Sequence, residues 1–308
     1  MSEAYRALRE SAAWFKLAAR GRIRAAGQDR ARLLHALCTN HIQQLAPGQG
    51  CYAFFLNAQG RILADANILC FEDHLLIDTE PERREFLAAH IDRYIIADDV
   101  TLEDRSPELS TLAVEGPRAA EILEQLGAQL PAEAHSWTRW GAGRIVARLS
   151  ATGGDGFWIL AAPPDVDALA ASLNLPEADP TDILAVRLEH GKPRYGDDIF
   201  DTTIPQETRL MHAVHFNKGC YLGQEIVERV RSRGRVHREL WRLLIEARNP
   251  PASGAKVMAG EKEAGQITTA AFSPHLAAVL AFAYLRVEFL TPAAEFSVDG
   301  CPARVFAQ

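Results

Sequence analysis

Cysteine is scarce and widely spaced in this chain of 308 residues. The number of cysteines is odd, and no Cys-x-x-Cys pair occurs among Cys38, Cys51, Cys70, Cys220 and Cys301. A disulfide framework needs an even set of cysteines and a zinc ribbon needs close pairs, so the sequence indicates neither. Free thiols at such spacing are typical of a reducing compartment.

Long hydrophobic runs are missing as well. The longest, from Leu276 to Leu285, has about half the length of a membrane-spanning helix and indicates a buried strand. Charged residues such as Arg6 and Glu10 interrupt the N-terminal segment, which therefore does not resemble a signal peptide. We expect a cytoplasmic protein that does not bind a membrane.

An excess of positive charge is also absent, since the net charge is −7. Nucleic-acid binding is driven by positive surface, so we expect no direct nucleic-acid partner. The exception is a basic stretch with an arginine at every second position: Arg229, Arg231, Arg233 and Arg235. In a strand these side chains would share one face. They could meet an acidic partner or RNA, but the net charge favours a solvated surface balanced by Glu225 and Glu228.

Several catalytic motifs are absent. The chain has no G-x-S-x-G, P-loop or H-E-x-x-H, so hydrolase, NTPase and zinc-protease functions have no support from motifs. His212 and His215 stand three residues apart, but no nearby spacing supplies the further ligands that a metal needs. We therefore expect no metal site, and interpret these histidines as structural or pocket-lining.

The arrangement of apolar residues predicts an α+β protein of about two domains. Helices are expected over residues 30–37, 81–94, 117–126, 163–173 and 182–190, with Thr181 capping the last and Gly191 ending it. Strands are expected over residues 49–55, 61–70 and 111–114 and near 157. Alternating Trp241, Leu243 and Ile245 open a stretch that predicts a small all-β domain. We place the boundary at Arg235, between a region over residues 1–235 and a C-terminal domain over 236–308.

The most unusual segment is an octet in which two glycines flank a cysteine and a tyrosine: Lys218-Gly219-Cys220-Tyr221-Leu222-Gly223-Gln224-Glu225. Glycines let the backbone turn sharply or approach a ligand closely. Lys218 and the arginines that follow are positive neighbours, which favour a thiolate. Cys220 is thus a candidate reactive thiol; the alternative is a buried, inert cysteine.

The octet resembles the K-G-C-Y-x-G-Q-E signature of the YgfZ-like folate-binding proteins. These belong to the superfamily of the T-protein (aminomethyltransferase) of the glycine cleavage system. Further segments similar to the superfamily are residues 60–65, 114–117, 152–157, 186–191, 195–199 and 204–207. The resemblance implies a three-lobed T-protein-like folate-binding fold with a small C-terminal β-barrel.

The resemblance also implies a function. YgfZ-like proteins are implicated in iron–sulfur cluster assembly or repair on certain enzymes and, through one of them, in tRNA modification. The expected function is therefore a protein that binds tetrahydrofolate or a one-carbon derivative and supports iron–sulfur client or assembly proteins, with one-carbon transfer at a reactive cysteine as its chemistry. Two alternatives stay open: an aminomethyltransferase, and a non-catalytic folate-binding scaffold.

Each part of a folate needs a different side chain. The donor edge of the pterin suits a carboxylate, for which Glu189 is the candidate. Tyr52 and Tyr195 could wall the benzoyl linker, and Arg187 could hold the anionic tail. The alternatives are a solvated helix carboxylate, core aromatic rings and a surface ion pair. Two residues apart on a helix, Arg187 and Glu189 point to different sides.

The expected catalytic residues are Cys220, Lys218 and Asp65, and Tyr221 and Gln224 of the octet are added to the cofactor-binding set. Asp65 matches the region of an Asp-Asp pair in the T-protein, but here Ala64 precedes it, so one carboxylate is lost. Trp158 stands where the T-protein has a glutamate that contacts folate. Both departures weaken the aminomethyltransferase interpretation, whereas the octet favours the YgfZ-like one.

Overall fold

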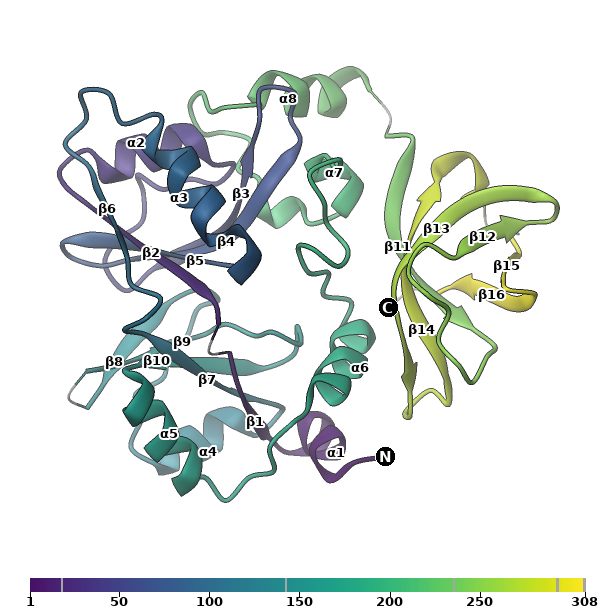
Figure 1. Cartoon of the computed structure of the whole chain (residues 1–308), viewed down its shortest axis with the longest axis horizontal. Coiled ribbons are helices and arrows are strands. Elements are labelled where there is room, and N and C mark those ends of the chain that lie inside the picture. The colour runs from purple at the N-terminus through teal and green to yellow at the C-terminus, as the bar shows by residue number, and fades with distance from the viewer. Residues whose placement is uncertain (18, 142, 235, 292–293, 307–308) are drawn as a thin grey trace.

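The computed structural model describes residues 1–17, 19–141, 143–234, 236–291 and 294–306. Two lobes, each built on a sheet, lie one above the other, and a barrel stands beside them (Figure 1). Helix α6 (Pro180–His190) lies between the second lobe and the barrel. The expected three-lobed α+β fold with a C-terminal barrel is confirmed.

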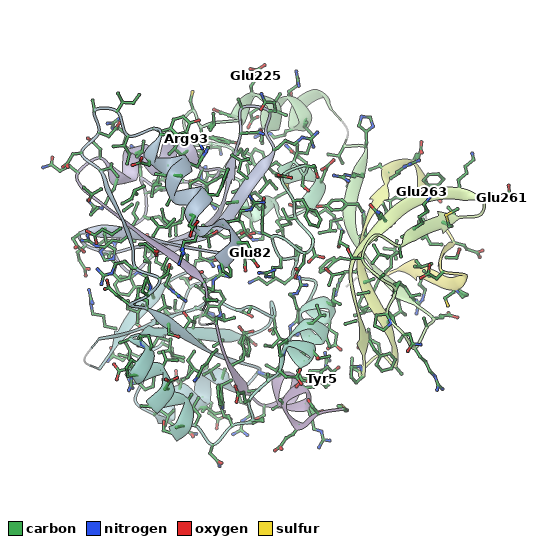
Figure 2. The ribbon with its side chains drawn as sticks, in the orientation of Figure 1. Tyr5, Glu82, Arg93, Glu225, Glu261 and Glu263 are labelled. Carbon is green, nitrogen blue, oxygen red and sulfur yellow. The ribbon has the colours of Figure 1, made fainter. Side chains whose placement is uncertain are left out.

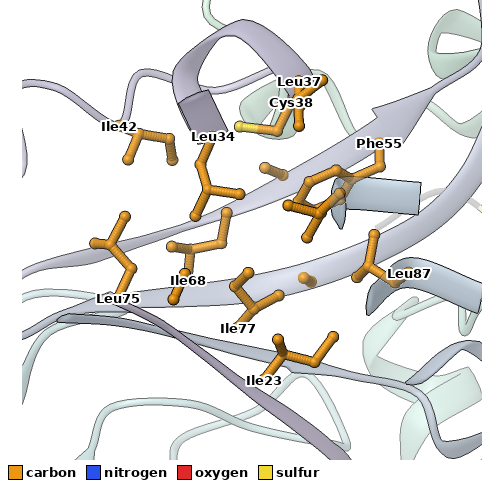
Figure 3. Packing of buried hydrophobic residues seen from close by; sticks show 14 of the residues in the cluster. Ile23, Leu34, Leu37, Cys38, Ile42, Phe55, Ile68, Leu75, Ile77 and Leu87 are labelled. Carbon is orange, nitrogen blue, oxygen red and sulfur yellow. The ribbon is translucent and has the colours of Figure 1, made fainter. Parts of the chain in front are cut away.

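The first lobe is an antiparallel sheet with two helices on one face. Its strands run in the order β3-β4-β5-β2-β6, with bounds Gly21–Ala26 (β2), Gly50–Leu56 (β3), Ile62–Cys70 (β4), His74–Thr79 (β5) and Thr101–Asp104 (β6). Helix α2 (Arg30–Leu37) and helix α3 (Arg84–Asp92), which follows a short 3-10 turn over Pro81–Arg83, bring Leu34 and Leu87 onto Ile68 and Ile77 (Figure 3). Other segments cover the opposite face, which explains why nearly all of β4 is buried.

The second lobe repeats this plan. Its sheet order is β1-β7-β10-β9-β8, with bounds Ala13–Lys16 (β1), Ser110–Glu115 (β7), Trp137–Trp140 (β8), Arg144–Ala147 (β9) and Gly156–Ala161 (β10). Helices α4 (Ala119–Gln125) and α5 (Pro163–Ser172) cover one face. The other face meets the first lobe, where Phe15 and Leu160 join Leu69 and Leu76 in one hydrophobic cluster.

Helix α6 packs against helix α1 (Glu3–Glu10) and two barrel strands. Its N-cap is Asp179, whose carboxylate accepts hydrogen bonds from the backbone N–H groups of Thr181 at 2.7 Å and Asp182 at 2.9 Å. The predicted cap, Thr181, is wrong because Pro180 already occupies the first helical position, so the capping residue must precede it. Gly191 ends the helix at φ 74°, as predicted.

A segment of short helices then crosses the face of the first sheet that lies opposite to α2 and α3. It contains α7 (Pro205–Thr208), a 3-10 turn over Met211–Ala213 and α8 (Gln224–Arg233). In a strand the basic stretch would share one face, but Arg229 and Arg231 lie on helix α8, where residues two apart do not share a face. Arg231 pairs with Glu228 at 3.5 Å, as the solvated interpretation expects, and Arg235 lies outside the described residues.

The C-terminal lobe is a closed antiparallel barrel in the order β11-β14-β13-β12-β15-β16. Its strands are Arg238–Ile245 (β11), Lys256–Ala259 (β12), Lys262–Ser273 (β13), Ala278–Arg286 (β14), Phe296–Val298 (β15) and Cys301–Val305 (β16), and a 3-10 turn over Val287–Phe289 follows β14. Leu243 and Ile245 point into its core, as their alternation predicts. Most of the longest apolar run forms β14, a buried strand as expected.

The predicted domain boundary stays a prediction, because Arg235 is outside the described residues; α8 ends before it at Arg233 and β11 begins after it at Arg238. Among the helices that the structure describes, none has the length and apolar character needed to cross a bilayer.

Candidate functional site

A central cavity of about 450 Å³ lies where the two sheets and α6 meet. It is mixed in character, because apolar side chains and a tryptophan share its lining with charged groups. The lining residues are Lys16, Leu17, Arg20, Tyr52, Asp65, Ala66, Asn67, Glu80, Ala151, Trp158, Pro180, Ile183, Leu184, Arg187, Lys192, Pro193, Arg194 and Asp197. A cleft of this size that combines apolar walls with placed polar groups is typical of a small-molecule site.

Strands β3 and β4 supply a carboxylate to the cavity wall. The Tyr52 hydroxyl donates a hydrogen bond to Asp65 Oδ2 at 2.7 Å. Burial, together with the nearby Glu80 carboxylate, raises the pKa of Asp65 to about 6. Ala64 points the other way, into the hydrophobic core of the first lobe, because successive strand residues alternate between faces. Asp65 is therefore the carboxylate that this part of β4 can present to a ligand.

Two arginines are held rigidly beside this carboxylate. Arg20 contacts Asp78 at 2.5 Å and Glu80 at 2.6 Å, and its guanidinium lies 5.0 Å from the centre of the Trp158 ring. Arg194 reaches Glu80 at 2.8 Å and Glu82 at 3.1 Å. Figure 2 shows Glu82 near the middle of the molecule, at the edge of the first lobe. The cations are thus oriented by the protein before any ligand arrives.

The opposite wall is organised by Glu115, which is fully buried. Its carboxylate accepts hydrogen bonds from the Trp158 indole at 3.2 Å, from Ser150 Oγ at 2.8 Å and from the Thr152 backbone N–H at 3.0 Å. Trp158 is therefore itself fixed by a carboxylate. Its flat ring lines the cavity.

Lys192 stands out among the cavity cations. Its ammonium donates a hydrogen bond to the Ser150 carbonyl, and within the described parts of the chain no carboxylate lies within ion-pair distance of it. Burial lowers the pKa of Lys192. A cation in this position can pair with an anionic ligand without first breaking an ion pair.

Of the expected cofactor-binding residues, Tyr52 and Arg187 line this cavity together with Asp65. Arg187 is buried and already paired, with Asp198 at 2.6 Å and Asp197 at 3.3 Å. Its guanidinium therefore stabilises the loop after α6 through these ion pairs, in addition to any contact with a ligand. Arg187 and Glu189 do point to different sides of the helix, as expected.

Glu189 is not among the described residues that line the cavity. Its carboxylate accepts hydrogen bonds from the Tyr5 hydroxyl and the Ser273 hydroxyl, each at 2.5 Å, and pairs with Arg9. These partners come from α1 and β13, and Figure 2 shows Tyr5 on α1, next to α6. These contacts join α6 to α1 and the barrel, and the assignment of Glu189 to the pterin stays a prediction.

The other two tyrosines belong to the packed face of the first sheet. Tyr195 and Tyr221 share a hydrophobic cluster with Phe54 and are 2% and 7% exposed. Gln224 begins α8, and its side chain accepts a hydrogen bond from the Tyr221 backbone N–H at 3.3 Å. These contacts correspond to the core alternative that the sequence left open for Tyr195, and none of these residues lines the cavity in the described structure.

The Lys218 ammonium is buried at the C-terminal end of α2. It donates hydrogen bonds to the carbonyls of His35 at 2.5 Å, Cys38 at 2.6 Å and Asn40 at 2.7 Å. A lysine has three donors, so all of them are used by the backbone and none remains for a thiol. The expected activation of Cys220 by Lys218 thus has no hydrogen bond to support it and stays a prediction; Cys220 is exposed, and no residue of the octet is among the described residues of the central cavity.

The residues that the sequence reasoning missed are Arg20, Glu80, Lys192 and Arg194. Lys192 and Arg194 lie between two segments that match the superfamily, and that position was the available signal. Arg20 and Glu80 directly adjoin the paired strands β2 and β5, whose residues Gly21 and Thr79 are partners. No local sequence pattern predicts this pairing. In the described ranges, no three His, Cys, Asp or Glu side chains are grouped so as to hold a metal ion.

Comparisons with known proteins identify the same architecture. Residues 1–218 match the family model "GCVT N-terminal domain", and residues 238–307 match "Glycine cleavage T-protein C-terminal barrel domain". An aminomethyltransferase of Rubrobacter xylanophilus is 30% identical, over 92% of this chain and 78% of the relative. One of Picosynechococcus is 28% identical, over 92% and 81%.

A solved structure agrees at the level of the fold. The glycine cleavage system aminomethyltransferase T of Bartonella henselae superposes with a TM-score of 0.89 at 21% identity, over 99% of this chain and 87% of that one. The narrower likeness to the YgfZ-like branch stays a prediction. With both of its family domains matched in order along its length, the chain belongs to the family of the glycine cleavage T-protein.

Proposed function

We propose that this protein binds tetrahydrofolate in the central cavity and acts as an aminomethyl-type, one-carbon transferase. The observation that carries the proposal is the buried Asp65 carboxylate, which stands beside a tryptophan wall and an excess of basic side chains in one cavity. The relatives named aminomethyltransferase at about 30% identity support the same reaction class.

The cavity residues fit the three parts of a folate. Asp65 has an oxygen, Oδ1, beyond the one that Tyr52 occupies, and this oxygen can meet a nitrogen of the folate. Trp158 offers a flat wall for a ring. Basic lining residues (Lys16, Arg20, Arg187, Lys192 and Arg194) outnumber the acidic Asp65, Glu80 and Asp197, which favours an anionic tail.

The chain's own groups have definite roles in this proposal. Tetrahydrofolate, when bound, supplies the nitrogen atoms that take up a one-carbon unit. Asp65, with a pKa of about 6, can hold or release a proton at Oδ1 near neutral pH, which is the requirement for a general acid or base. Tyr52 orients the carboxylate, and Lys192 is the cation best placed to meet the tail.

Titration tests the binding half. Tetrahydrofolate should quench tryptophan fluorescence saturably, and Asp65→Ala should abolish the effect while Cys220→Ser leaves it unchanged. For the transfer half, an aminomethylated lipoyl carrier is added with tetrahydrofolate, and release of ammonia with methylenetetrahydrofolate is measured. No saturable binding would refute the proposal; binding without product would reduce it to a folate-binding scaffold.

A second function is favoured by one separate observation. Cys220 is exposed within the octet that resembles the YgfZ-like proteins, and it is not among the described lining residues of the cavity. We propose that this thiol contacts a partner protein, and that this contact supports iron–sulfur enzymes. A disruption strain should regain iron–sulfur enzyme activities with the wild-type chain but not with Cys220→Ser; equal complementation by both would remove this function.

A further inference from the structure

A second pocket, of about 300 Å³, lies between the C-terminal end of α6 and the barrel. Pro193 lines both this pocket and the central cavity, so the loop after α6 separates two concave sites. The lining combines two arginines with aromatic rings: His190, Gly191, Pro193, Thr208, Arg209, Leu210, Leu240, Trp241, Arg242, Phe282 and Phe306. Neither the proposed folate site nor the octet accounts for it.

Arg242 reaches this pocket from the barrel strand β11. The side chain is only 8% exposed, and its Nη1 donates hydrogen bonds to the carbonyls of Leu188, at 3.1 Å, and Glu189 at the end of α6. Its guanidinium also lies 5.0 Å from the centre of the Phe306 ring. Gly191 makes room for it, since a Cβ there would lie 3.0 Å from Arg242 Cζ.

Part of this guanidinium has no hydrogen-bond partner among the residues that the structure describes. An arginine carries five N–H donors, and the two hydrogen bonds to α6 both leave from Nη1. For Nε and Nη2 no acceptor is found in the described structure, nor does any described carboxylate lie within 4.0 Å. The helix end therefore compensates the charge only in part, and two donor groups remain for a ligand.

Arg209 brings a second guanidinium to the same pocket. Its centre lies 3.6 Å from the centre of the Trp241 ring. The nearby Glu239 carboxylate accepts a hydrogen bond from the Trp241 indole at 3.1 Å and forms no ion pair with Arg209 among the described contacts. Arg209 is also held at φ 63°, a conformation that is unusual for a residue with a Cβ and tends to occur at functional positions.

The charge balance of this pocket differs from that of the central cavity. There, Arg20, Arg187 and Arg194 each contact a carboxylate. Here, neither Arg209 nor Arg242 has a carboxylate partner among the described residues, and burial together with the closeness of Arg209 lowers the pKa of Arg242. Arg242 is buried and Arg209 is exposed, and an anion between them would offset the repulsion of the two like charges.

We propose that this pocket is a second binding site, which takes a carboxylate or phosphate group between Arg209 and Arg242. Guanidinium groups bind both oxyanions through paired N–H donors, and the Trp241 and Phe306 rings hold the two guanidiniums in place beforehand. The volume exceeds that of a lone oxyanion, so the group belongs to a small molecule. The site is independent of the proposed folate function.

Calorimetric titration of the full chain with inorganic phosphate and, separately, with glutarate tests this site. We expect saturable binding of at least one probe, and the probe that saturates identifies phosphate or carboxylate as the ligand group. Arg209→Gln should weaken binding at least roughly tenfold, because a charged hydrogen-bond partner is lost. The matched control Arg286→Gln, an exposed arginine elsewhere on the barrel, should bind like wild type.

Two further variants keep the test decisive. Arg242→Lys retains the charge but loses the paired N–H donors of the guanidinium, and it should weaken binding. This variant is informative only if its thermal unfolding transition equals that of wild type. If the transition shifts, the result with Arg209→Gln decides the test. Lys192→Gln, which removes the central-cavity cation without a described ion pair, should bind the probes like wild type. The proposal is overturned if neither probe saturates, if Arg209→Gln binds as tightly as wild type, or if Lys192→Gln alone abolishes binding, which would assign the anion to the central cavity.

Discussion

Asp65→Asn should make the protein more stable while removing folate binding. The substitution is nearly isosteric, and the Tyr52 hydroxyl can still donate its hydrogen bond to the amide oxygen. What disappears is a carboxylate that is 7% exposed and whose pKa is raised to about 6, mainly by burial and then by Glu80. In wild type the charged form is disfavoured in the folded state, and the amide has no such penalty.

The sign and size of this stability change follow from the linkage between folding and proton binding. Because the folded-state pKa is raised, the folded protein holds the Asp65 proton more tightly than the unfolded chain. The stability contributed by this proton is complete below about pH 4 and is lost as pH rises through about 6. Relative to wild type, Asp65→Asn should gain about 1.5 kcal/mol in unfolding free energy at pH 5 and about 3 kcal/mol at pH 8.

Urea denaturation at the two pH values measures this difference, and tetrahydrofolate titration at pH 8 measures the loss of function. Asp167→Asn, an exposed aspartate paired with Lys16, is the control and should change stability by no more than about 0.5 kcal/mol at either pH. The reasoning would be refuted if Asp65→Asn were less stable than wild type, or if its gain in unfolding free energy did not grow with pH. Either result would mean that burial does not disfavour the charged form of Asp65.

Three other substitutions test the octet. Lys218→Met should cost about 3 kcal/mol in urea denaturation, since three carbonyls lose a charged donor; a neutral effect would mean that water replaces it. Gly223→Ala should lower Tm through a loss of about 2 kcal/mol, because φ is 84° and the new Cβ would lie 2.6 Å from the Asn57 carbonyl; an unchanged Tm would contradict this clash. Cys220→Ser, at an exposed position, should alter stability by under about 0.5 kcal/mol, and a larger loss would show a packed thiol.

Local sequence signals were reliable where a single element contains its own pattern. The helix over Arg30–Leu37 forms as predicted, because Leu33, Leu34 and Leu37 place one apolar face on the sheet. The cap glycine Gly191 and the alternation along β11 were equally local. In each case the periodicity and the backbone conformation are properties of a few consecutive residues.

The same reasoning is insufficient where the decisive contact is distant in sequence. The alternating arginines would share one face of a strand, yet they lie on α8, whose Val227 packs with Tyr195 and Phe54 in one hydrophobic cluster. Lys218 stands two residues before Cys220, yet its ammonium turns to carbonyls about 180 positions away along the chain. Sequence proximity does not indicate where a long side chain finds its hydrogen-bond acceptors.

Periodicity along the chain was enough to predict the α+β class, the all-β C-terminal part and the strand that carries Asp65, and short motifs were enough to indicate the superfamily and its barrel. Which charged groups meet could be seen only in the folded chain, where Arg20, Glu80 and Lys192 surround Asp65, Glu189 contacts Tyr5, and Arg209 and Arg242 share a pocket without a described carboxylate partner. Electrostatic partnership depends on distance in space and on burial, and both are set by how three lobes pack.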